Sequence, residues 1–259
     1  MTVKEQQAAE EKWRRTCNQV VDRMMEHVRP FVVPLSYEME SEVRLIGTGT
    51  FVLGANGTTV VTCEHVARNA PLNFRPNGQE AVCGYRGEWS VHPEPVDAAW
   101  TIGSLATPTL LAKAVQPHQI ALQHDLYQPE ELLFFYGYSG ENSTFAFETH
   151  ITNGSGYLTQ QNRDAQPNLG VIELLWPNGE ENWSEGTTEE ARRNMQFSDP
   201  AGFSGALVWN TRFLETGADL NQWTPDQAVV TAILKRFVPR DRVLLATPIE
   251  TVRSVGSLV

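Results

Sequence analysis

Hydrophobic positions in the first thirty residues recur at intervals of three and four. They are Trp13, Cys17, Val20, Val21, Met24 and Val28, and charged residues stand between them. This spacing is typical of an amphipathic α-helix, which Pro30 is expected to end. We expect the helix to pack on the body of the protein; a coiled coil or a partner-binding helix is the alternative.

From about residue 43 the hydrophobic pattern changes to that of β-strands. The runs 45–53 and 58–62 flank Asn56-Gly57, a dipeptide that favours a tight hairpin turn. Many short strands separated by Gly, Pro and Asn predict an all-β sandwich or barrel rather than alternating strands and helices. The segment 248–255 is expected to form a short closing helix. Further strand-like runs lie near residues 81–85, 98–102, 132–136, 144–150, 171–175, 205–209, 228–234 and 243–247.

Composition narrows the class of protein. The 259 residues include 20 Lys and Arg against 31 Asp and Glu, a formal net charge of −11. Because nucleic acids and anionic membranes both require a basic face, we expect neither as a partner. No run reaches the ~18 apolar residues of a transmembrane helix, and the first residues do not resemble a signal peptide. Three cysteines are too few for a disulfide framework, so we expect free thiols in a reduced, cytoplasmic protein.

Three short segments carry the candidate chemistry. His65 follows an apolar strand, Asp97 begins another, and Ser204 lies in a turn between Gly202 and Gly205. A serine hydroxyl is a poor nucleophile unless a base accepts its proton and a third group orients that base. The backbone N–H of Gly202 could face a developing oxyanion beside that of Ser204. The order and local context of the three segments favour an acyl-transfer site.

In this order the segments resemble those of trypsin-like serine proteases with the chymotrypsin fold, in the style of short bacterial and HtrA-like members without extra domains. The similarity spans about residues 43–255. It is carried by Gly47-Thr-Gly-Thr-Phe-Val52 before the histidine, Thr62-Cys-Glu-His-Val66 around it, Asp97-Ala-Ala-Trp100, Gly202-Phe-Ser-Gly-Ala-Leu207 and the closing Ala246-Thr-Pro-Ile-Glu250.

The resemblance implies an all-β fold of two six-stranded antiparallel β-barrels with the active site in the cleft between them. The N-terminal helix, residues 1–30, would precede a protease domain of residues 31–259. Within that domain, the first barrel would cover about 43–125, the second about 126–247, and the closing helix 248–255.

The resemblance also implies a role for each site residue. His65 would act as general base and then general acid, Asp97 would orient it, and Ser204 would attack. The N–H groups of Gly202 and Ser204 would form the oxyanion hole. A second serine, Ser139, has the same Gly-x-Ser-Gly surroundings, but it would lie near the start of the second barrel, away from the cleft.

One departure from the family pattern concerns the oxyanion turn. Phe203 stands where digestive relatives have an aspartate that pairs with a newly freed N-terminal amine. Phenylalanine cannot make this pair, so activation by N-terminal cleavage is not expected. The acidic segment 178–193 precedes the turn, and we hypothesise that a regulatory protein partner or a substrate organises residues 178–203. A solvated surface loop is the alternative.

Substrate preference stays open at the level of sequence. Family analogy places the base of the pocket at Ser198, next to Asp199, which would suit a basic side chain. The presumed wall of the pocket carries Lys235 and Arg236, which would suit an acidic one. Because these signals conflict, the sequence predicts no preference for the residue before the cut.

The function expected from the sequence is a serine endopeptidase that acts on protein or peptide substrates without a cofactor or metal. The histidines outside the candidate triad show no metal-ligand spacing such as His-Glu-x-x-His. A catalytically silent protease fold that binds or regulates is one alternative. An esterase-type acyl hydrolase is another, although Ala206 breaks the Gly-x-Ser-x-Gly pattern of the α/β-hydrolases.

Overall fold

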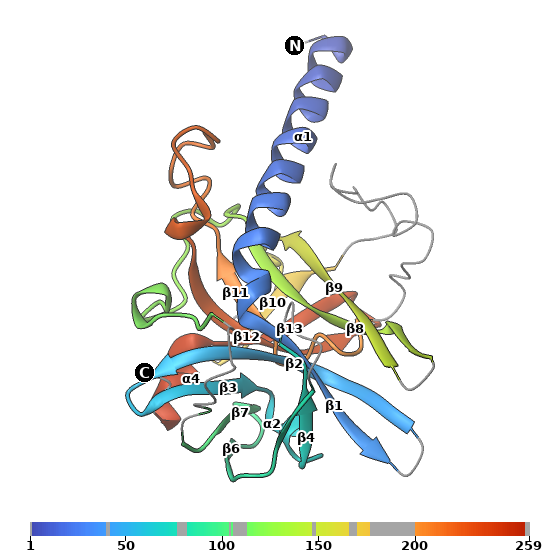
Figure 1. Cartoon of the computed structure of the whole chain (residues 1–259). Coiled ribbons are helices and arrows are strands. Elements are labelled where there is room, and N and C mark those ends of the chain that lie inside the picture. The colour runs from blue at the N-terminus through green and yellow to red at the C-terminus, as the bar shows by residue number, and fades with distance from the viewer. Residues whose placement is uncertain are drawn as a thin grey trace.

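Two curled antiparallel β-sheets, a long N-terminal helix and a short C-terminal helix make up the protein in this computed structural model (Figure 1). The structure describes residues 2–39, 42–76, 82–103, 105, 113–146, 149–165, 170–176 and 200–256. The expected all-β architecture with a helix at each end is therefore confirmed.

The first sheet has the strand order β5-β4-β1-β2-β3-β7-β6. Among the described residues it therefore contains seven strands instead of the expected six, and it begins well before residue 43. The early strand was missed because Pro34, which has no backbone N–H, weakens the strand signal of its run. The strands are β1 (Val32–Met39), β2 (Glu42–Gly54), β3 (Gly57–Thr62), β4 (Leu72–Phe74), β5 (Cys83–Tyr85), β6 (Trp89–His92) and β7 (Ala98–Thr101).

The hairpin between β2 and β3 forms at the predicted turn. Gly54 pairs with Gly57, and Gly57 has a φ of +113°, a backbone conformation that favours glycine. The hairpin positions the candidate histidine, because the chain leaves the sheet directly after Thr62 and enters the short helix α2 (Glu64–Ala67).

The second sheet has the expected six strands, in the order β10-β13-β12-β11-β8-β9. Along β12 the pairing with β13 shifts register between Leu234 and Arg236, so Lys235 is the extra residue of a β-bulge. The strands are β8 (Leu133–Ala146), β9 (Thr149–Thr159), β10 (Ile172–Leu175), β11 (Leu207–Asn210), β12 (Val229–Val238) and β13 (Val243–Pro248).

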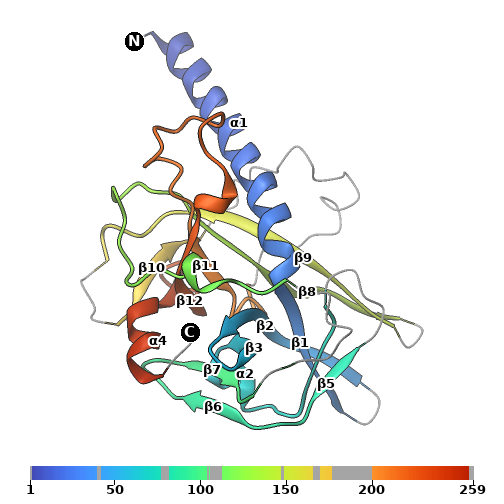
Figure 2. The ribbon, with the colours of Figure 1, turned by 60° about the vertical axis from the view of Figure 1, so that its left-hand side comes forward.

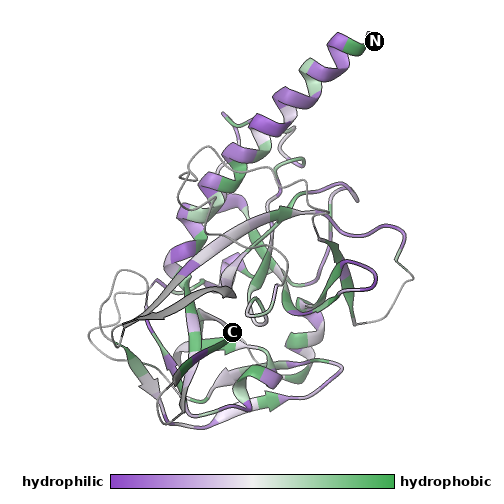
Figure 3. Ribbon diagram, turned by 90° about the vertical axis from the view of Figure 1, so that its right-hand side faces the viewer, coloured by the Kyte–Doolittle hydropathy of each residue, from purple (hydrophilic) through white to green (hydrophobic). Residues whose placement is uncertain are grey.

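The helix α1 (Val3–Val28) follows the predicted amphipathic pattern only in its second half. Val20, Met24 and Val28 are buried, whereas Trp13 stays 42% exposed. The first half projects away from the sheets, and its surface is largely hydrophilic (Figure 3). Within the described residues, no helix combines the length and the hydropathy needed to cross a bilayer.

The C-terminal helix α4 (Ile249–Val255) follows β13 directly and contacts β12 and β13 of the second sheet (Figure 2). Its Ile249 and Val252 are buried, and both belong to a hydrophobic core that spans the two sheets. A second, smaller core lies within the second sheet and contains Phe135, Trp176 and Phe203. The turn that carries Ser204 lies between these two cores, next to the strands of both sheets.

Candidate active site

The candidate general base, His65, lies in the single turn of α2. Cys63 occupies the N-cap position, and its neighbour Glu64 is buried, so the turn is fixed on the sheet. The His65 side chain points the other way and is 43% exposed. The outer edge of the imidazole can therefore contact a substrate, while the inner edge contacts the protein.

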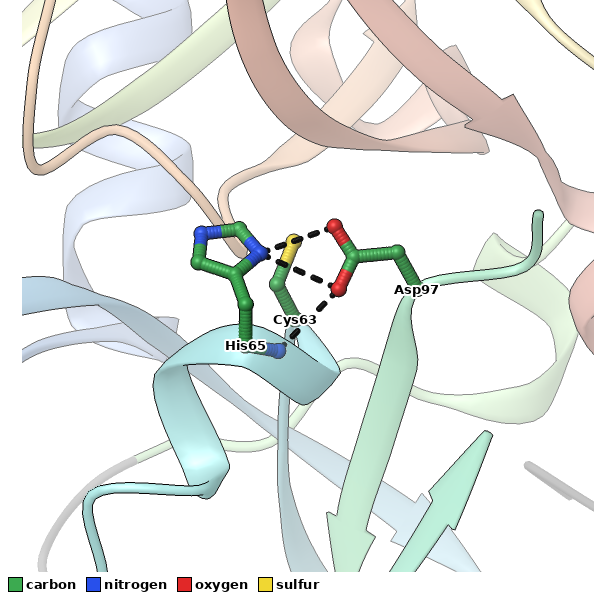
Figure 4. Close-up of side chains that lie close together, drawn as sticks. All are labelled: Cys63, His65 and Asp97. Carbon is green, nitrogen blue, oxygen red and sulfur yellow. Dashed lines mark hydrogen bonds and ion pairs between the residues drawn. The ribbon is translucent and has the colours of Figure 1, made fainter. Parts of the chain in front are cut away.

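Asp97 contacts the inner edge of the His65 imidazole. Its Oδ1 accepts a hydrogen bond from the backbone N–H of His65 at 3.1 Å, and Oδ1 and Oδ2 lie 3.0 and 2.8 Å from His65 Nδ1 (Figure 4). The carboxylate fixes Nδ1 as the protonated nitrogen, which leaves Nε2 as the acceptor. Burial alone would raise the pKa of Asp97, but the hydrogen bonds from the side chain and backbone of His65 outweigh it and hold this pKa below its ordinary value.

The backbone of Asp97 is unusual, because its φ is +50°. Left-handed conformations are uncommon for residues other than glycine and persist where the surroundings enforce them. The side chain is only 4% exposed, and the backbone N–H donates to Pro93 O at 3.2 Å. The loop before β7 therefore presents the carboxylate to His65 in a conformation that other contacts must maintain.

Ser204 lies in a turn that only glycines on either side permit. Gly202 and Gly205 have φ values of +104° and +92°. A Cβ atom on Gly202 would lie 2.4 Å from Tyr138 O, and one on Gly205 would lie 2.2 Å from Thr48 O. The turn is thus pressed against both sheets, since Tyr138 belongs to β8 and Thr48 to β2.

Thr48 attaches this turn to the first sheet. Its backbone N–H donates to Ser204 O at 2.9 Å, and its hydroxyl donates to Gly202 O at 2.8 Å. The sequence showed Thr48 only as part of the glycine-rich run before the histidine. Its contacts join residues more than 150 positions apart, and no local pattern announces such a contact.

The hydroxyl of Ser204 is engaged with the backbone. Ser204 Oγ donates to Lys235 O at 2.9 Å, and the described residues form no hydrogen bond between Ser204 and His65. Over the same part of the chain, the backbone N–H groups of Gly202 and Ser204 donate to no protein acceptor. The structure therefore pairs His65 with Asp97 directly, whereas the hydroxyl of Ser204 is turned to β12.

Cys63 brings a thiol to the same place. Its Sγ donates to Leu234 O at 3.2 Å, the carbonyl that also accepts the N–H of Gly205. Burial first, and then the charge of Asp97, raise the pKa of Cys63 well above its ordinary value.

Cys63 is also part of the one group of potential metal ligands in the described part of the chain. It comprises Cys63, His65 and Asp97, whose donor atoms lie within 4.8 Å of one another (Figure 4). A metal there would need the Cys63 thiolate and a free nitrogen of His65, in place of the hydrogen bond from Cys63 to Leu234 O and the contact of His65 Nδ1 with Asp97.

Phe203 anchors the oxyanion turn by aromatic packing. The ring is 1% exposed and meets Phe135 and Tyr157 edge to face, at centroid distances of 5.5 and 5.4 Å. Trp176 lies 6.4 Å away. The sequence shows that Phe203 replaces an aspartate but not which residues its ring contacts, because the three partners come from separate strands or loops.

The remaining sequence candidates divide into two groups. Ser139 lies on β8, is 1% exposed, and borders the turn more closely than expected, since Gly140 N donates to Ala201 O. Ser198, Asp199 and the acidic segment 178–193 lie outside the described residues.

Comparison by sequence finds neither a matching protein-family model nor a matching curated protein. Comparison by structure finds Rv3671c of Mycobacterium tuberculosis, in the inactive form of a serine-to-alanine variant. It has 14% identity and a TM-score of 0.50, over 91% of this chain and 89% of that chain. It also finds the apo MamO protease domain of Magnetospirillum magneticum, with 14% identity and a TM-score of 0.49, over 88% of this chain and 96% of that chain. At this identity the likeness to Rv3671c concerns the fold alone. Together with the two curled antiparallel sheets, it shows that the chain has a chymotrypsin-like fold.

Proposed function

We propose that this protein is a serine endopeptidase that hydrolyses peptide bonds of protein or peptide substrates. The observation that carries the proposal is the His65–Asp97 pair, in which Nδ1 and Oδ2 lie 2.8 Å apart. The glycine-flanked turn of Ser204 is hydrogen-bonded through Thr48 to the sheet from which His65 extends. Each of these groups has a defined chemical role in acyl transfer. The chymotrypsin-like fold supports the same reaction class, although a fold by itself does not determine activity.

In the proposed reaction, His65 Nε2 accepts the proton of Ser204 Oγ while Oγ attacks the carbonyl carbon of the scissile bond. The N–H groups of Gly202 and Ser204 stabilise the oxyanion. His65 then donates the proton to the leaving amine as the C–N bond breaks, which leaves an acyl group on Ser204. Water, activated by His65, hydrolyses the acyl-enzyme in the second half of the reaction.

Asp97 contributes to both halves. It fixes His65 with Nε2 as the acceptor and stabilises the imidazolium that forms when the serine proton is transferred. Its lowered pKa supports this role, because the carboxylate stays ionised throughout the neutral range. The Ser204 hydroxyl has to rotate from Lys235 O to His65 before attack. Catalytic hydrogen bonds are often completed only when the substrate is bound.

A catalytically silent protease fold is the second candidate, and the Ser204–Lys235 hydrogen bond is the observation that favours it. If substrate binding does not move the hydroxyl, His65 has no proton to accept. In that case the cleft would serve to bind a peptide rather than cut it. The two candidates differ in the reactivity of one side chain.

Labelling with a fluorophosphonate probe tests the proposal, because the probe forms a covalent bond only with an activated serine. We expect stoichiometric labelling of the wild-type protein and no labelling of Ser204→Ala, and loss of the serine should lower turnover by on the order of 10⁴–10⁶-fold. Ser139→Ala is the matched control, because Ser139 has the same Gly-x-Ser-Gly surroundings. This substitution should leave labelling unchanged. An adduct that mass spectrometry maps to Ser139, or no adduct at all, would refute the assignment.

A further inference from the structure

Lys235 is a basic residue whose side chain is buried. It is the extra residue of the bulge in β12, and its side chain is only 2% exposed. Lysine is almost never fully buried unless its ammonium group has partners. A bulge next to an active site commonly redirects a side chain that an ordinary strand would point elsewhere.

The partners of Lys235 lie on the other sheet, in the loop that carries Asp97. Lys235 Nζ donates to Glu94 Oε2 at 2.8 Å and to Pro95 O at 2.9 Å, residues about 140 positions earlier in the chain. Glu94 is half-exposed and also pairs with Arg236, whereas Pro95 O is fixed by the buried ammonium. Lys235 thus holds the backbone two residues before Asp97.

A second contact from the second sheet secures the next residue of the loop. Thr247 Oγ1 donates to Val96 O at 2.7 Å. Together with Lys235 it fixes two consecutive carbonyls directly before Asp97, whose own φ is +50°. A left-handed residue without glycine needs such over-determination to stay in place.

The backbone of Lys235 faces the nucleophile. Lys235 O accepts the Ser204 hydroxyl at 2.9 Å, and the preceding Leu234 exchanges backbone hydrogen bonds with Gly205 and Ala206. One residue therefore touches both halves of the site: its side chain fixes the Asp97 loop and its carbonyl holds Ser204. The charge acts in the same direction, because the Lys235 ammonium contributes to the lowered pKa of Asp97.

We propose that Lys235 is a positioning residue for the His65–Asp97 pair. It fixes the Asp97 carboxylate relative to β12, the strand whose Lys235 O accepts the Ser204 hydroxyl. This inference rests on the proposed function for its catalytic consequence but not for its structural content. If it is right, loss of the ammonium loosens Asp97 and misplaces the imidazole, and a displacement of about 1 Å can cost on the order of 100-fold in rate. If Lys235 is only an inter-sheet contact, its loss lowers stability and leaves the pair intact.

The test compares Lys235→Met with two other variants. Glu94→Gln changes a half-exposed partner and keeps the lysine, so it serves if Lys235→Met does not fold. Arg68→Met is the matched control, because Arg68 also lies within the electrostatic reach of Asp97 but pairs with Glu64 and anchors no residue of the loop. Circular dichroism and thermal unfolding establish that each variant is folded.

Two readouts separate the inference from the proposed function. The first is the nuclear magnetic resonance signal of the His65 Nδ1 proton in ¹⁵N-histidine protein, assigned by its loss in His65→Gln. The second is the fluorophosphonate labelling rate as a function of pH. We expect Lys235→Met to broaden or displace the proton signal and to slow labelling about 10- to 100-fold across the pH range. Glu94→Gln should act in the same direction but less, and Arg68→Met should keep the wild-type signal and maximal rate.

Each outcome decides one of the two claims. An unchanged proton signal in folded Lys235→Met, or in Glu94→Gln where Lys235→Met is unfolded, overturns the role of Lys235. A wild-type protein that shows the proton signal but takes no probe overturns the proposed function, while the signal in the variants still tests Lys235. Equal loss in Arg68→Met would show that charge alone, and not positioning, explains the effect, which also contradicts the inference.

Discussion

Replacing Phe203 with alanine tests how the oxyanion turn is held. The ring is 1% exposed and packs on Phe135, Tyr157 and Trp176, so its removal leaves a cavity that three large neighbours cannot readily fill. Truncation of a buried phenylalanine to alanine costs about 3–5 kcal/mol in the free energy of unfolding. A domain of this size is stabilised by about 5–15 kcal/mol, so the variant should fold but with much reduced stability. Phe203→Leu keeps most of the apolar contact and should cost about 1–2 kcal/mol.

Urea denaturation followed by tryptophan fluorescence measures these costs, and Trp176 reports on the same cluster. Fluorophosphonate labelling without denaturant measures whether the turn still presents Ser204. We expect labelling to slow in Phe203→Ala and to stay close to wild type in Phe203→Leu. Phe203 lies between Gly202 and Ser204, so loss of its packing should displace both neighbours. A loss below about 1 kcal/mol in Phe203→Ala, or normal labelling by a strongly destabilised variant, would refute the view that this packing holds the turn.

Two further predictions concern ionisable groups: the carboxylate of Asp97 and the buried thiols of Cys63 and Cys17. Because the pKa of Asp97 is lowered in the folded protein, its contribution to stability is present above the ordinary aspartate pKa of about 4 and is lost as the pH falls through the lower folded value. Acid titration of the free energy of unfolding should therefore be less steep in Asp97→Asn than in the wild type between about pH 5 and pH 2, and an equal slope would contradict this. Burial raises the pKa of Cys63 well above the ordinary value and that of Cys17 to about 11, so Ellman's reagent at pH 8 should modify neither rapidly in the native protein but all three free cysteines in urea. Fast native modification of Cys63, identified by peptide mapping, would show that the thiol beside His65 is accessible.

The parts of the fold that the sequence predicted are those encoded by neighbouring residues. The Asn56-Gly57 hairpin, the short C-terminal helix and the buried half of α1 each depend on a local pattern, and each is confirmed. The strand β1 was missed because its one proline obscured a run whose pairing with β2 and β4 is decided by tertiary structure.

The site divides in the same way. His65, Asp97 and Ser204 could be named in advance, because each has a recognisable local context. The contacts that hold them could not. Its strand alone places Lys235 on the wall of a pocket, whereas in the structure Lys235 lies in a bulge and its side chain reaches Pro95 O in the loop before β7. From the sequence, Phe203 is expected only to lack the ion pair of an aspartate. Its aromatic partners are seen in the packed structure alone.

Cleavage of peptide bonds by Ser204 can be observed by digestion of a complex peptide library analysed by mass spectrometry. Carried out in H₂¹⁸O with the wild-type protein and Ser204→Ala side by side, it identifies every new C-terminus that incorporates the heavy oxygen. We predict internal cleavages by the wild-type protein that share sequence features around the cut, and none by Ser204→Ala. No cleavage by a protein that accepts the fluorophosphonate probe, or identical cleavage by both proteins, would contradict cleavage by Ser204.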